Sequence, residues 1–491
     1  MLETGVPNLD LILGGGIPEG DILLVVGPAG SGKTTLSLQM AFHNAASGQN
    51  ALYISTLSEP PTRLIQHVKG FSFLDERLIG KRMFLRSMYP LIRQGLDKVA
   101  DALVQAAKEH QARLVIVDGL MTIRDLYPQE AELRAFIYEM GDALRALNTT
   151  TVMTSSGIER TEEHPMPEFT MTDGILELGK QDIGTQTVRT IRSSKMRGLP
   201  NFLGQQSLRL DSGGITVYPR IESVFEPTDI GLSTERVHLG LPELDTMMEG
   251  GPLACSTTLL SGSLGTGKTM ACLQYLIEGA KQGQKGLFVG LRETQSQLID
   301  KARSLGMDLE TPIKDGLVAV FHRSPVDLIV DEVTWEMLCK VECFAPQRLA
   351  LDSVVELEQA TGEQKRARGY MFSLAGSLRA KGITSLITKE VPQVVGPELD
   401  FSETPLAVLA ENLVLLRYVE FRGELFRILS VLKMRDSDHD HSIRQYTITE
   451  KGFKVLARVE SAEGVLTGIA RLASEMRVKR PVREVRREEG S

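Results

Sequence analysis

Two glycine-rich segments of the chain have the residue types and the spacing of a loop that binds phosphate. Both fit the pattern Gly-x-x-x-x-Gly-Lys-Thr, and both follow an apolar stretch and precede a segment with helical spacing. The glycines allow successive backbone N–H groups to point at phosphate oxygens, and the following helix directs the positive end of its dipole at the same anion. Lys33 and Lys268 are expected to reach the β- and γ-phosphates of ATP and to take part in its hydrolysis, while Thr34 and Thr269 offer hydroxyls to Mg²⁺. The residues predicted to bind nucleotide are Gly27, Pro28, Ala29, Gly30, Ser31, Gly32, Lys33, Thr34 and Thr35 in the first segment, and Gly262, Ser263, Leu264, Gly265, Thr266, Gly267, Lys268, Thr269 and Met270 in the second.

An aspartate follows each loop at a matched position. Asp118 ends the apolar segment LVIVD and Asp352 ends RLALD, and each segment is expected to form a strand directly beside the strand that precedes the phosphate loop. A carboxylate at that place can hold Mg²⁺ through a water molecule. An aspartate at a strand end can instead cap a helix or stabilise a turn. Because the position recurs in both copies, the predicted Mg²⁺ residues are Thr34 with Asp118 and Thr269 with Asp352.

A glutamate follows the next expected strand in both halves. The matched triplets are Leu57-Ser58-Glu59 and Leu291-Arg292-Glu293. A carboxylate at a strand end can orient or deprotonate an attacking water molecule. A glutamate at the start of a helix is otherwise a favourable partner for the helix dipole. We interpret Glu59 and Glu293 as the catalytic candidates.

These residues belong to a chain that repeats itself once. GVPNLD and GLPELD, the two phosphate loops, LVIVDG and RLALDS, and SSKMRG and VLKMRD occur in the same order in each half. The period is the length of a domain, which indicates duplicated domains and excludes a solenoid. We predict domains at residues 1–219 and 233–454, a linker at residues 220–232 interrupted by proline, and a C-terminal helix with a flexible charged tail at residues 455–491.

The elements that must position these residues alternate between apolar strands and amphipathic helices. In the first copy the expected strands are DILLVVG, ALYIST, RLVIVD and TTVMTSS, and LSLQMAFHNAA and AELRAFIYEMGDALRAL have helical spacing. Continuous apolar strands alternating with helices predict a mostly parallel sheet covered on both faces, which is a doubly wound α/β fold. TVRTIRSSKM and FRILSVLKM predict antiparallel strands near the end of each domain.

Composition limits the class of protein. The 491 residues carry 24% charged and 42% hydrophobic side chains, with 55 Lys and Arg against 63 Asp and Glu, for a net charge of −8. This acidity argues against a chain that coats nucleic acid. The four cysteines lack the spacing of a zinc site. No secretory signal and no apolar run of membrane length is visible, so a cytoplasmic protein without a membrane span is expected.

The chain resembles the KaiC family, which are ATPases of the RecA superfamily. The resemblance rests on the paired phosphate loops, on GGGIPEGD, and above all on LVLLRYVEFRGELFRILSVLKMRDSDHDHSIRQYTI at residues 413–448. It implies two tandem RecA-like domains and a homo-oligomer, a hexameric ring with ATP bound between subunits. It also implies that residues of one subunit contact the nucleotide held by the neighbouring phosphate loop. The matching residues are Lys195, Met196, Arg197, Lys433, Met434, Arg435 and His439.

Two departures from the family pattern bear on activity. The family usually has two adjacent glutamates where this chain has Ser58 before Glu59 and Arg292 before Glu293. Slow turnover, or turnover carried by the second glutamate, is therefore expected, with Arg292 weakening the second site further. The residues that match the phosphate acceptors of the clock protein are Ala407 and Val408, which have no hydroxyl. Autophosphorylation at the usual positions is excluded, and the substitute acceptors are Ser402 and Thr404.

Four functions are consistent with these patterns. The leading interpretation is a ring-forming ATPase that hydrolyses ATP at subunit interfaces and acts in regulation or signalling. The second is a nucleotide-gated scaffold with little turnover, which exposes its C-terminal tail to a protein partner. The third is a serine/threonine autokinase, and the fourth is a motor that handles DNA. Against the DNA motor, the chain has no evident basic, aromatic-rich loop of the kind that binds single-stranded DNA.

Overall fold

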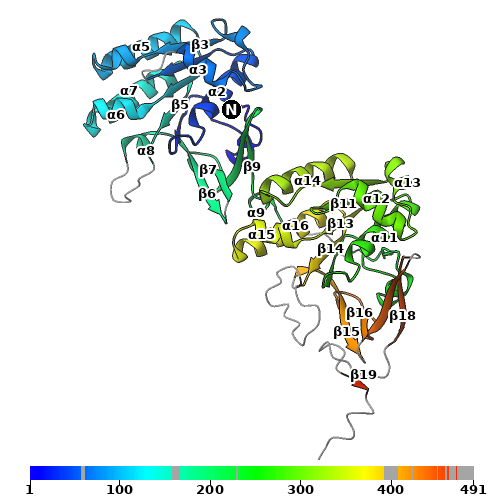
Figure 1. The fold of residues 1–491 in the computed structure, drawn as a ribbon. Coiled ribbons are helices and arrows are strands. Elements are labelled where there is room, and N and C mark those ends of the chain that lie inside the picture. The colour runs from blue at the N-terminus through cyan, green and yellow to red at the C-terminus, as the bar shows by residue number, and fades with distance from the viewer. Residues whose placement is uncertain are drawn as a thin grey trace, which may run out of the picture. The chain divides into compact units, whose positions relative to one another are not determined.

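The computed structural model describes residues 1–56, 61–157, 166–184, 186–200, 202, 204–227, 231, 233–391, 407, 409–421, 424–449, 452–458, 462–463 and 471–472. The chain forms two compact units, Met1–Val224 and Phe225–Ser491. Each unit contains a nine-stranded sheet with helices on its faces (Figure 1). The prediction of two α/β domains with a mostly parallel sheet is confirmed.

The first unit builds its sheet in the order β3-β2-β4-β5-β1-β6-β7-β8-β9. The strands from β3 to β6 are parallel, and β7, β8 and β9 extend the sheet in antiparallel pairs. Its elements are α1 (Leu9–Ile12), β1 (Ile22–Val26), α2 (Lys33–Ala46), β2 (Ala51–Ser55), α3 (Pro61–Val68), η1 (Glu76–Leu78), β3 (Met83–Ser87), α4 (Tyr89–Ile92), α5 (Leu96–Glu109), β4 (Leu114–Asp118), α6 (Leu120–Leu126), α7 (Glu130–Ala146), β5 (Thr150–Ser155), α8 (Pro167–Met171), β6 (Gly174–Ile183), β7 (Gln186–Met196), β8 (Gln206–Asp211), β9 (Gly214–Tyr218) and α9 (Ile221–Val224).

The central strands are apolar throughout because both faces of the sheet are covered. All five residues of β1 are buried. Leu23 and Val25 pack in one core with α2, whereas Leu24 and Val26 pack in a second core with α5 and α7. Alternate side chains of a strand point to opposite faces, so a strand buried on both sides reads as a continuous apolar run.

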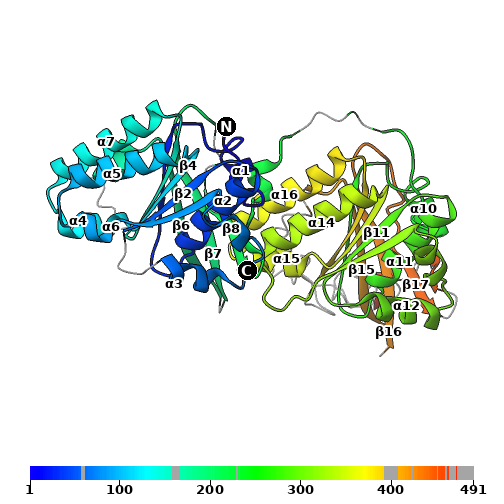
Figure 2. The ribbon, with the colours of Figure 1, turned by 90° about the horizontal axis from the view of Figure 1, so that it is seen from above.

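The second unit repeats this arrangement in the order β12-β11-β13-β14-β10-β15-β16-β17-β18. Figure 2 shows α11 and α12 on one side of the sheet and α14, α15 and α16 on the other. Its elements are α10 (Pro242–Met247), β10 (Thr257–Gly262), α11 (Lys268–Lys281), β11 (Gly286–Gly290), α12 (Gln295–Ser304), α13 (Glu310–Lys314), β12 (Val318–His322), α14 (Val330–Phe344), β13 (Arg348–Asp352), α15 (Val355–Ala360), α16 (Gln364–Ala380), β14 (Thr384–Glu390), β15 (Asn412–Phe421), β16 (Glu424–Met434), β17 (Arg444–Thr449), β18 (Gly452–Arg458), β19 (Ala462–Glu463) and β20 (Arg471–Leu472).

The expected neighbours of the phosphate-loop strands are wrong. The strands that end in Asp118 and Asp352 do not pair with β1 and β10, because β5 and β14 lie between them. Crossover helices let consecutive strands skip a place in a parallel sheet, so chain order alone does not give strand order. The aspartates nevertheless lie at the same edge of the sheet as the phosphate loops, because all of these parallel strands have their carboxyl ends there.

The expected segments outside the sheets need three corrections. Residues 221–224 of the expected linker form helix α9. Strand β18 continues to Arg458, past the expected end of the second domain at residue 454. Arg471–Leu472 pair as a strand with Ala462–Glu463, so the expected C-terminal helix is wrong at these two residues. Its spacing was apolar and helical, but it contains a glycine, and strand pairing overrides so weak a helical preference.

The rest of that segment and the tail lie outside the described residues. In the parts of the chain that the structure describes, none of the helices combines the length and apolar character needed to cross a bilayer.

Candidate nucleotide sites

The first phosphate loop connects the end of β1 to the start of α2. The ammonium of Lys33 donates hydrogen bonds to the carbonyl oxygens of Gly27 (2.7 Å) and Pro28 (3.0 Å), so this side chain curls back over its own loop. A Cβ atom at Gly27 would lie 2.6 Å from the carbonyl oxygen of Leu178 on β6. Only glycine fits there, because no side-chain carbon approaches a backbone oxygen so closely.

The second loop has the same geometry between β10 and α11. The ammonium of Lys268 donates to the carbonyl oxygens of Gly262 (2.9 Å) and Ser263 (2.8 Å). A Cβ atom at Gly262 would lie 2.6 Å from the carbonyl oxygen of Leu416 on β15. The two copies of the motif therefore fold into the same local structure, as their sequences predict.

Both loop lysines are cations held in a partly desolvated place. Burial lowers the pKa of Lys33, and the Asp118 carboxylate opposes this effect. Burial likewise lowers the pKa of Lys268, opposed by Glu390 and Asp352. A desolvated ammonium whose hydrogen bonds go only to carbonyl oxygens is suited to an incoming anion.

The predicted threonine–aspartate pairs lie in contact in both units. The hydroxyl of Thr34 donates to Asp118 (3.0 Å), and that of Thr269 donates to Asp352 (2.5 Å). The helices that follow Asp118 and Asp352 have other N-cap residues, Gly119 and Val354, so neither aspartate is a helix cap. The two side chains predicted to hold Mg²⁺ are thus brought together twice.

Sequence reasoning missed the residues that orient these carboxylates. Asp118 also accepts hydrogen bonds from the hydroxyls of Tyr53 on β2 and Thr154 on β5. Asp352 accepts one from Thr388 on β14. Thr154 and Thr388 have matched places in TTVMT and TSLIT. A comparison of the two copies could have identified them.

The atoms around the loops fit a triphosphate with Mg²⁺. Among the described residues, the buried hydroxyls of Ser31 and Ser263 have no hydrogen-bond partner. Buried polar groups without partners are uncommon in folded proteins and indicate a missing ligand or water. Together with the lysines and the threonine–aspartate pairs, they form a polar cradle at the N-terminus of a helix.

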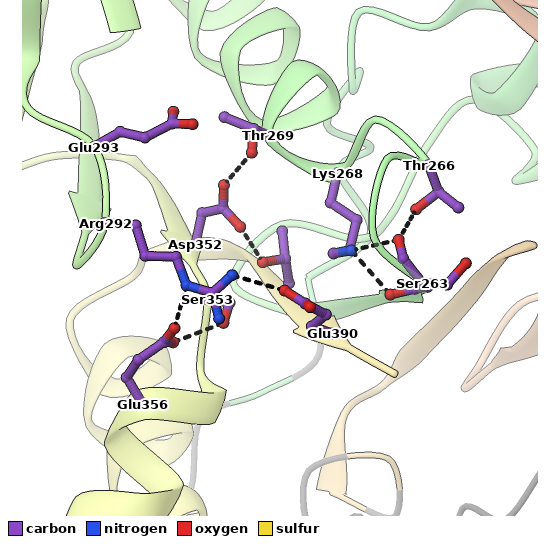
Figure 3. Close-up of polar contacts among 12 residues, drawn as sticks. Ser263, Thr266, Lys268, Thr269, Arg292, Glu293, Asp352, Ser353, Glu356 and Glu390 are labelled. Atoms are coloured by element: carbon purple, nitrogen blue, oxygen red, sulfur yellow. Dashed lines mark hydrogen bonds and ion pairs between the residues drawn. The ribbon is translucent and has the colours of Figure 1, made fainter. Parts of the chain in front are cut away.

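In the second unit a cavity of about 540 Å³ opens beside this cradle. Loop residues and Asp352 form one wall, and residues from β11, α12, β14, β16 and β17 complete it. The lining residues are Leu264, Gly265, Gly267, Lys268, Thr269, Met270, Phe288, Arg292, Glu293, Lys301, Leu305, Asp352, Ser353, Glu390, Arg427 and Ile448. Figure 3 shows Thr269 pointing at Asp352 and Lys268 folded over Ser263.

Comparison with known proteins places this geometry in a family. The family described as "ATPase: KaiC" matches residues 2–222 and again residues 237–460. The chain belongs to the KaiC family. "Circadian clock protein KaiC3" of Synechocystis sp. is 28% identical over 494 residues, covering 98% of this chain and 96% of the relative.

Two further KaiC relatives have the same level of similarity. "Circadian clock oscillator protein KaiC" of Picosynechococcus sp. is 28% identical, covering 95% of this chain and 92% of the relative. The protein of that name from Parathermosynechococcus lividus is 28% identical, covering 95% and 87%. The similarity therefore extends over both units, and the resemblance inferred from the motifs is confirmed.

The second catalytic candidate lies in the cavity of this KaiC chain. The carboxylate of Glu293 forms an ion pair with Lys301 on α12, and its other oxygen is buried without a partner among the described residues. Glu293 precedes the cap residue Thr294 of α12, so it does not cap that helix itself. The first candidate, Glu59, and its neighbour Ser58 lie outside the described residues. Lys301 was missed because nothing in its sequence position marks it as the partner of Glu293.

The residues that match the family's contacts to a neighbouring subunit lie at corresponding strand ends. Lys195 at the end of β7 donates to the carbonyl oxygens of Phe169 and Thr172, and Arg197 pairs with Asp173 at 3.3 Å. The cavity beside the second phosphate loop is not lined by Lys433, Met434, Arg435 or His439 of the same chain. Met196 and Met434 end strands β7 and β16 beside these cations.

Lys433 at the end of β16 repeats the arrangement of Lys195. Its ammonium donates to the carbonyl oxygens of Ala407 (3.3 Å) and Ala410 (2.7 Å). Ala407 is buried. Val408 and the substitute acceptors Ser402 and Thr404 lie outside the described residues.

The loop after β16 carries the remaining predicted contact, His439. Ligand atoms of Asp438, His439 and His441 lie within 4.8 Å of one another. The His439 and His441 rings meet edge to face at 4.3 Å, and Nε2 of His439 is buried without a hydrogen-bond partner among the described residues. This loop therefore keeps His439 in a polar cluster close to the strand end that carries Lys433 and Arg435.

Proposed function

We propose that this KaiC-family chain binds ATP with Mg²⁺ at both phosphate loops and hydrolyses ATP at the subunit interfaces of a hexameric ring. The observation that carries the proposal is the repeated contact of a loop threonine with a strand-end aspartate, beside a lysine folded over its loop. These are the protein groups that hold the phosphates and the metal in P-loop ATPases.

Each group has a definite role in this proposal. Lys33 and Lys268 leave their loop carbonyls to bind β- and γ-phosphate oxygens. Thr34 with Asp118, and Thr269 with Asp352, would hold Mg²⁺. Bound Mg²⁺ would neutralise charge on the phosphates. Glu59 and Glu293 are the candidate bases that orient the attacking water.

The neighbouring subunit supplies further cations. Lys195 and Arg197, and Lys433 and Arg435, are proposed to reach the nucleotide held by the adjacent subunit, with Met196, Met434 and His439 beside them. Cations positioned at the transferring phosphoryl group stabilise the charge that develops in the transition state. The family membership supports this arrangement.

Regulation or signalling is the proposed biological role, because the similar relatives are named as circadian clock proteins. We further propose a cytoplasmic location and a protein partner at the C-terminal tail. The acidic net charge of −8 argues against a DNA-handling motor.

The test is steady-state phosphate release by the full chain with ATP and Mg²⁺. The double variant Lys33→Ala with Lys268→Ala should lose at least about 99% of that release, since the lysines contact the transferring phosphate. Lys81→Ala changes an exposed lysine of the first unit and is the matched control. Release that persists in the double variant would refute the assignment of the loops.

A nucleotide-gated scaffold is the second candidate function. It is favoured by the ion pair between Glu293 and Lys301, which holds the candidate base of the second site on a cation. Hexamers that form with ATP in the absence of phosphate release would decide for this function. Autophosphorylation is the third, and mass spectrometry after incubation with ATP would detect phosphate on Ser402 or Thr404.

A further inference from the structure

The second site contains a cluster of three charged residues: Arg292, Glu356 and Glu390. Arg292 follows β11, Glu356 lies on α15 and Glu390 ends β14. The guanidinium donates through Nε to Glu356 and through Nη1 to Glu390, the latter at 2.7 Å. Figure 3 shows Arg292 between these two carboxylates, with Glu390 on the side nearer to Lys268. One cation therefore bridges two acids beside the phosphate loop.

The matched positions of the first copy carry none of these three charges. Ser58 matches Arg292 in the paired triplets Leu57-Ser58-Glu59 and Leu291-Arg292-Glu293. Thr122 of the first copy matches Glu356, because each lies four residues after the strand-end aspartate of its copy. Ser156 of the first copy matches Glu390, because each lies two residues after the threonine that donates to the strand-end aspartate. The second copy therefore differs from the first at all three positions of the cluster.

The cluster is placed where it acts on a bound nucleotide. Arg292 and Glu390 line the same cavity as Lys268, Thr269 and Asp352. The charges of Glu390 and Arg292 both act on Lys268, Glu390 raising its pKa and Arg292 lowering it. An unpaired Glu390 would repel a triphosphate at this place, so Arg292 is needed to neutralise it.

The guanidinium has the capacity to bind a phosphate as well. Its two hydrogen bonds use Nε and Nη1, and Nη2 donates no hydrogen bond to the described residues. Arg292 is 50% exposed, which leaves it accessible from the cavity. A guanidinium carries five N–H donors in a plane that matches a phosphate as well as it matches a carboxylate.

In the same site the candidate base, Glu293, is paired with a cation. Lys301 pairs with Glu293. The oxygen of Glu293 that Lys301 holds is not free to accept a hydrogen bond from an attacking water. Binding of ATP and its turnover are therefore separable in the second site.

We propose that Arg292 recognises the terminal phosphate of ATP by donating through its guanidinium to a γ-phosphate oxygen while it continues to neutralise Glu390. The second site would then select ATP over ADP and hold it with little turnover. This inference rests on the proposed function of the second loop as a nucleotide site.

The test measures the affinity of the full chain carrying Lys33→Ala, so that the second loop is the remaining intact site. Isothermal titration compares a non-hydrolysable ATP analogue with ADP, both with Mg²⁺. Arg292→Ser, which installs the residue of the first copy, should weaken the ATP analogue about tenfold or more and ADP less than about twofold, because a charge-assisted hydrogen bond is lost only with the γ-phosphate. Glu390→Gln should strengthen binding of the ATP analogue relative to ADP, since it removes a negative charge beside the γ-phosphate and leaves more of the positive charge of Arg292 to the nucleotide.

The matched control is Arg323→Ser. Arg323 pairs with Glu336 through two nitrogens and is 49% exposed, but it does not line the cavity. This variant should leave both affinities unchanged. Arg292→Lys keeps the charge without the planar donors and should retain part of the preference for the ATP analogue.

The outcomes are distinguishable. If the Lys33→Ala chain binds neither nucleotide, the second loop is not a nucleotide site and both proposals are overturned. If both nucleotides bind and Arg292→Ser weakens them equally or not at all, the role of Arg292 is overturned while the proposed function stands. Where Arg292→Ser fails to fold, Glu390→Gln decides: an unchanged ratio of the two affinities would overturn the inference.

Discussion

Thr34 donates a 3.0 Å hydrogen bond to Asp118, although 84 positions of the chain separate them. Thr269 and Asp352 repeat the contact at 2.5 Å in the second unit. Each pair joins the first turn of the helix after a phosphate loop to the end of a strand that does not pair with the loop's own strand. The contact is therefore a property of the folded sheet, and it is the place at which we propose that Mg²⁺ binds.

Replacement of this aspartate should impair the use of Mg²⁺. Asp118→Asn keeps the shape and one acceptor oxygen but removes the charge, so the Mg²⁺ concentration needed for half-maximal phosphate release should rise about 10- to 100-fold. A magnesium titration of phosphate release measures this. Asp101→Asn, at an exposed position of α5, is the control. An unchanged midpoint would argue against a metal role for Asp118.

The two candidate bases should contribute unequally to turnover. Glu59→Gln should lower phosphate release about 100-fold or more, the range for loss of a general base. Glu293→Gln should change it less than about twofold, because Glu293 is already paired with Lys301. Single-turnover assays with each variant measure both effects. A large loss in Glu293→Gln alone would reverse the assignment of the two sites.

Cations supplied from a neighbouring subunit can be detected by mixing two inactive variants. Arg197→Ala removes a cation of the first site, and Lys33→Ala removes its loop lysine. If the cation acts across the interface, subunits mixed in equal amounts should regain about a quarter of wild-type release, because about one interface in four then has both intact residues. Mixtures that remain as inactive as the separate variants would place Arg197 in its own subunit's site.

The first residue of the phosphate loop should not tolerate a methyl group. In Gly27→Ala the added carbon would meet the Leu178 carbonyl oxygen at 2.6 Å, so the loop must move and the free energy of unfolding should fall by about 1–3 kcal/mol. Gly70→Ala adds a methyl group where no atom lies within 4 Å, and it is the control. Urea denaturation compares the two variants. Equal stability of both would mean that the loop is less tightly packed than its contacts indicate.

The buried loop lysine should make the stability of the nucleotide-free chain depend on alkaline pH. Burial lowers the pKa of Lys268 in the folded chain. Between that pKa and the higher value of the unfolded chain, the unfolded state binds more protons, so the free energy of unfolding rises with pH. Lys268→Met lacks this proton. The stability of wild type relative to Lys268→Met should therefore increase from about pH 7 to about pH 10. Urea denaturation at both pH values measures the difference, and a constant difference would contradict a lowered pKa.

Local sequence determined the phosphate loops. Glycines, a lysine and a threonine at fixed spacing between an apolar strand and a helix have one low-energy arrangement, and the two copies adopt it independently. The repeated landmarks likewise determined that there are two similar α/β units. The Tyr53 hydroxyl as a partner of Asp118 was beyond such reasoning, because Tyr53 comes from another strand and Phe288 stands at its matched place in the second copy.

Tertiary structure decided which charged residues meet at the second site. Three separate parts of the chain supply Arg292, Glu356 and Glu390. The sequence gives the sign of each charge but not which of these side chains are in contact. Strand order is set by crossover packing, which depends on how whole faces of helices and sheet fit together. Short-range spacing therefore determined the groups that can bind a phosphate, and long-range packing decided the charges that surround it.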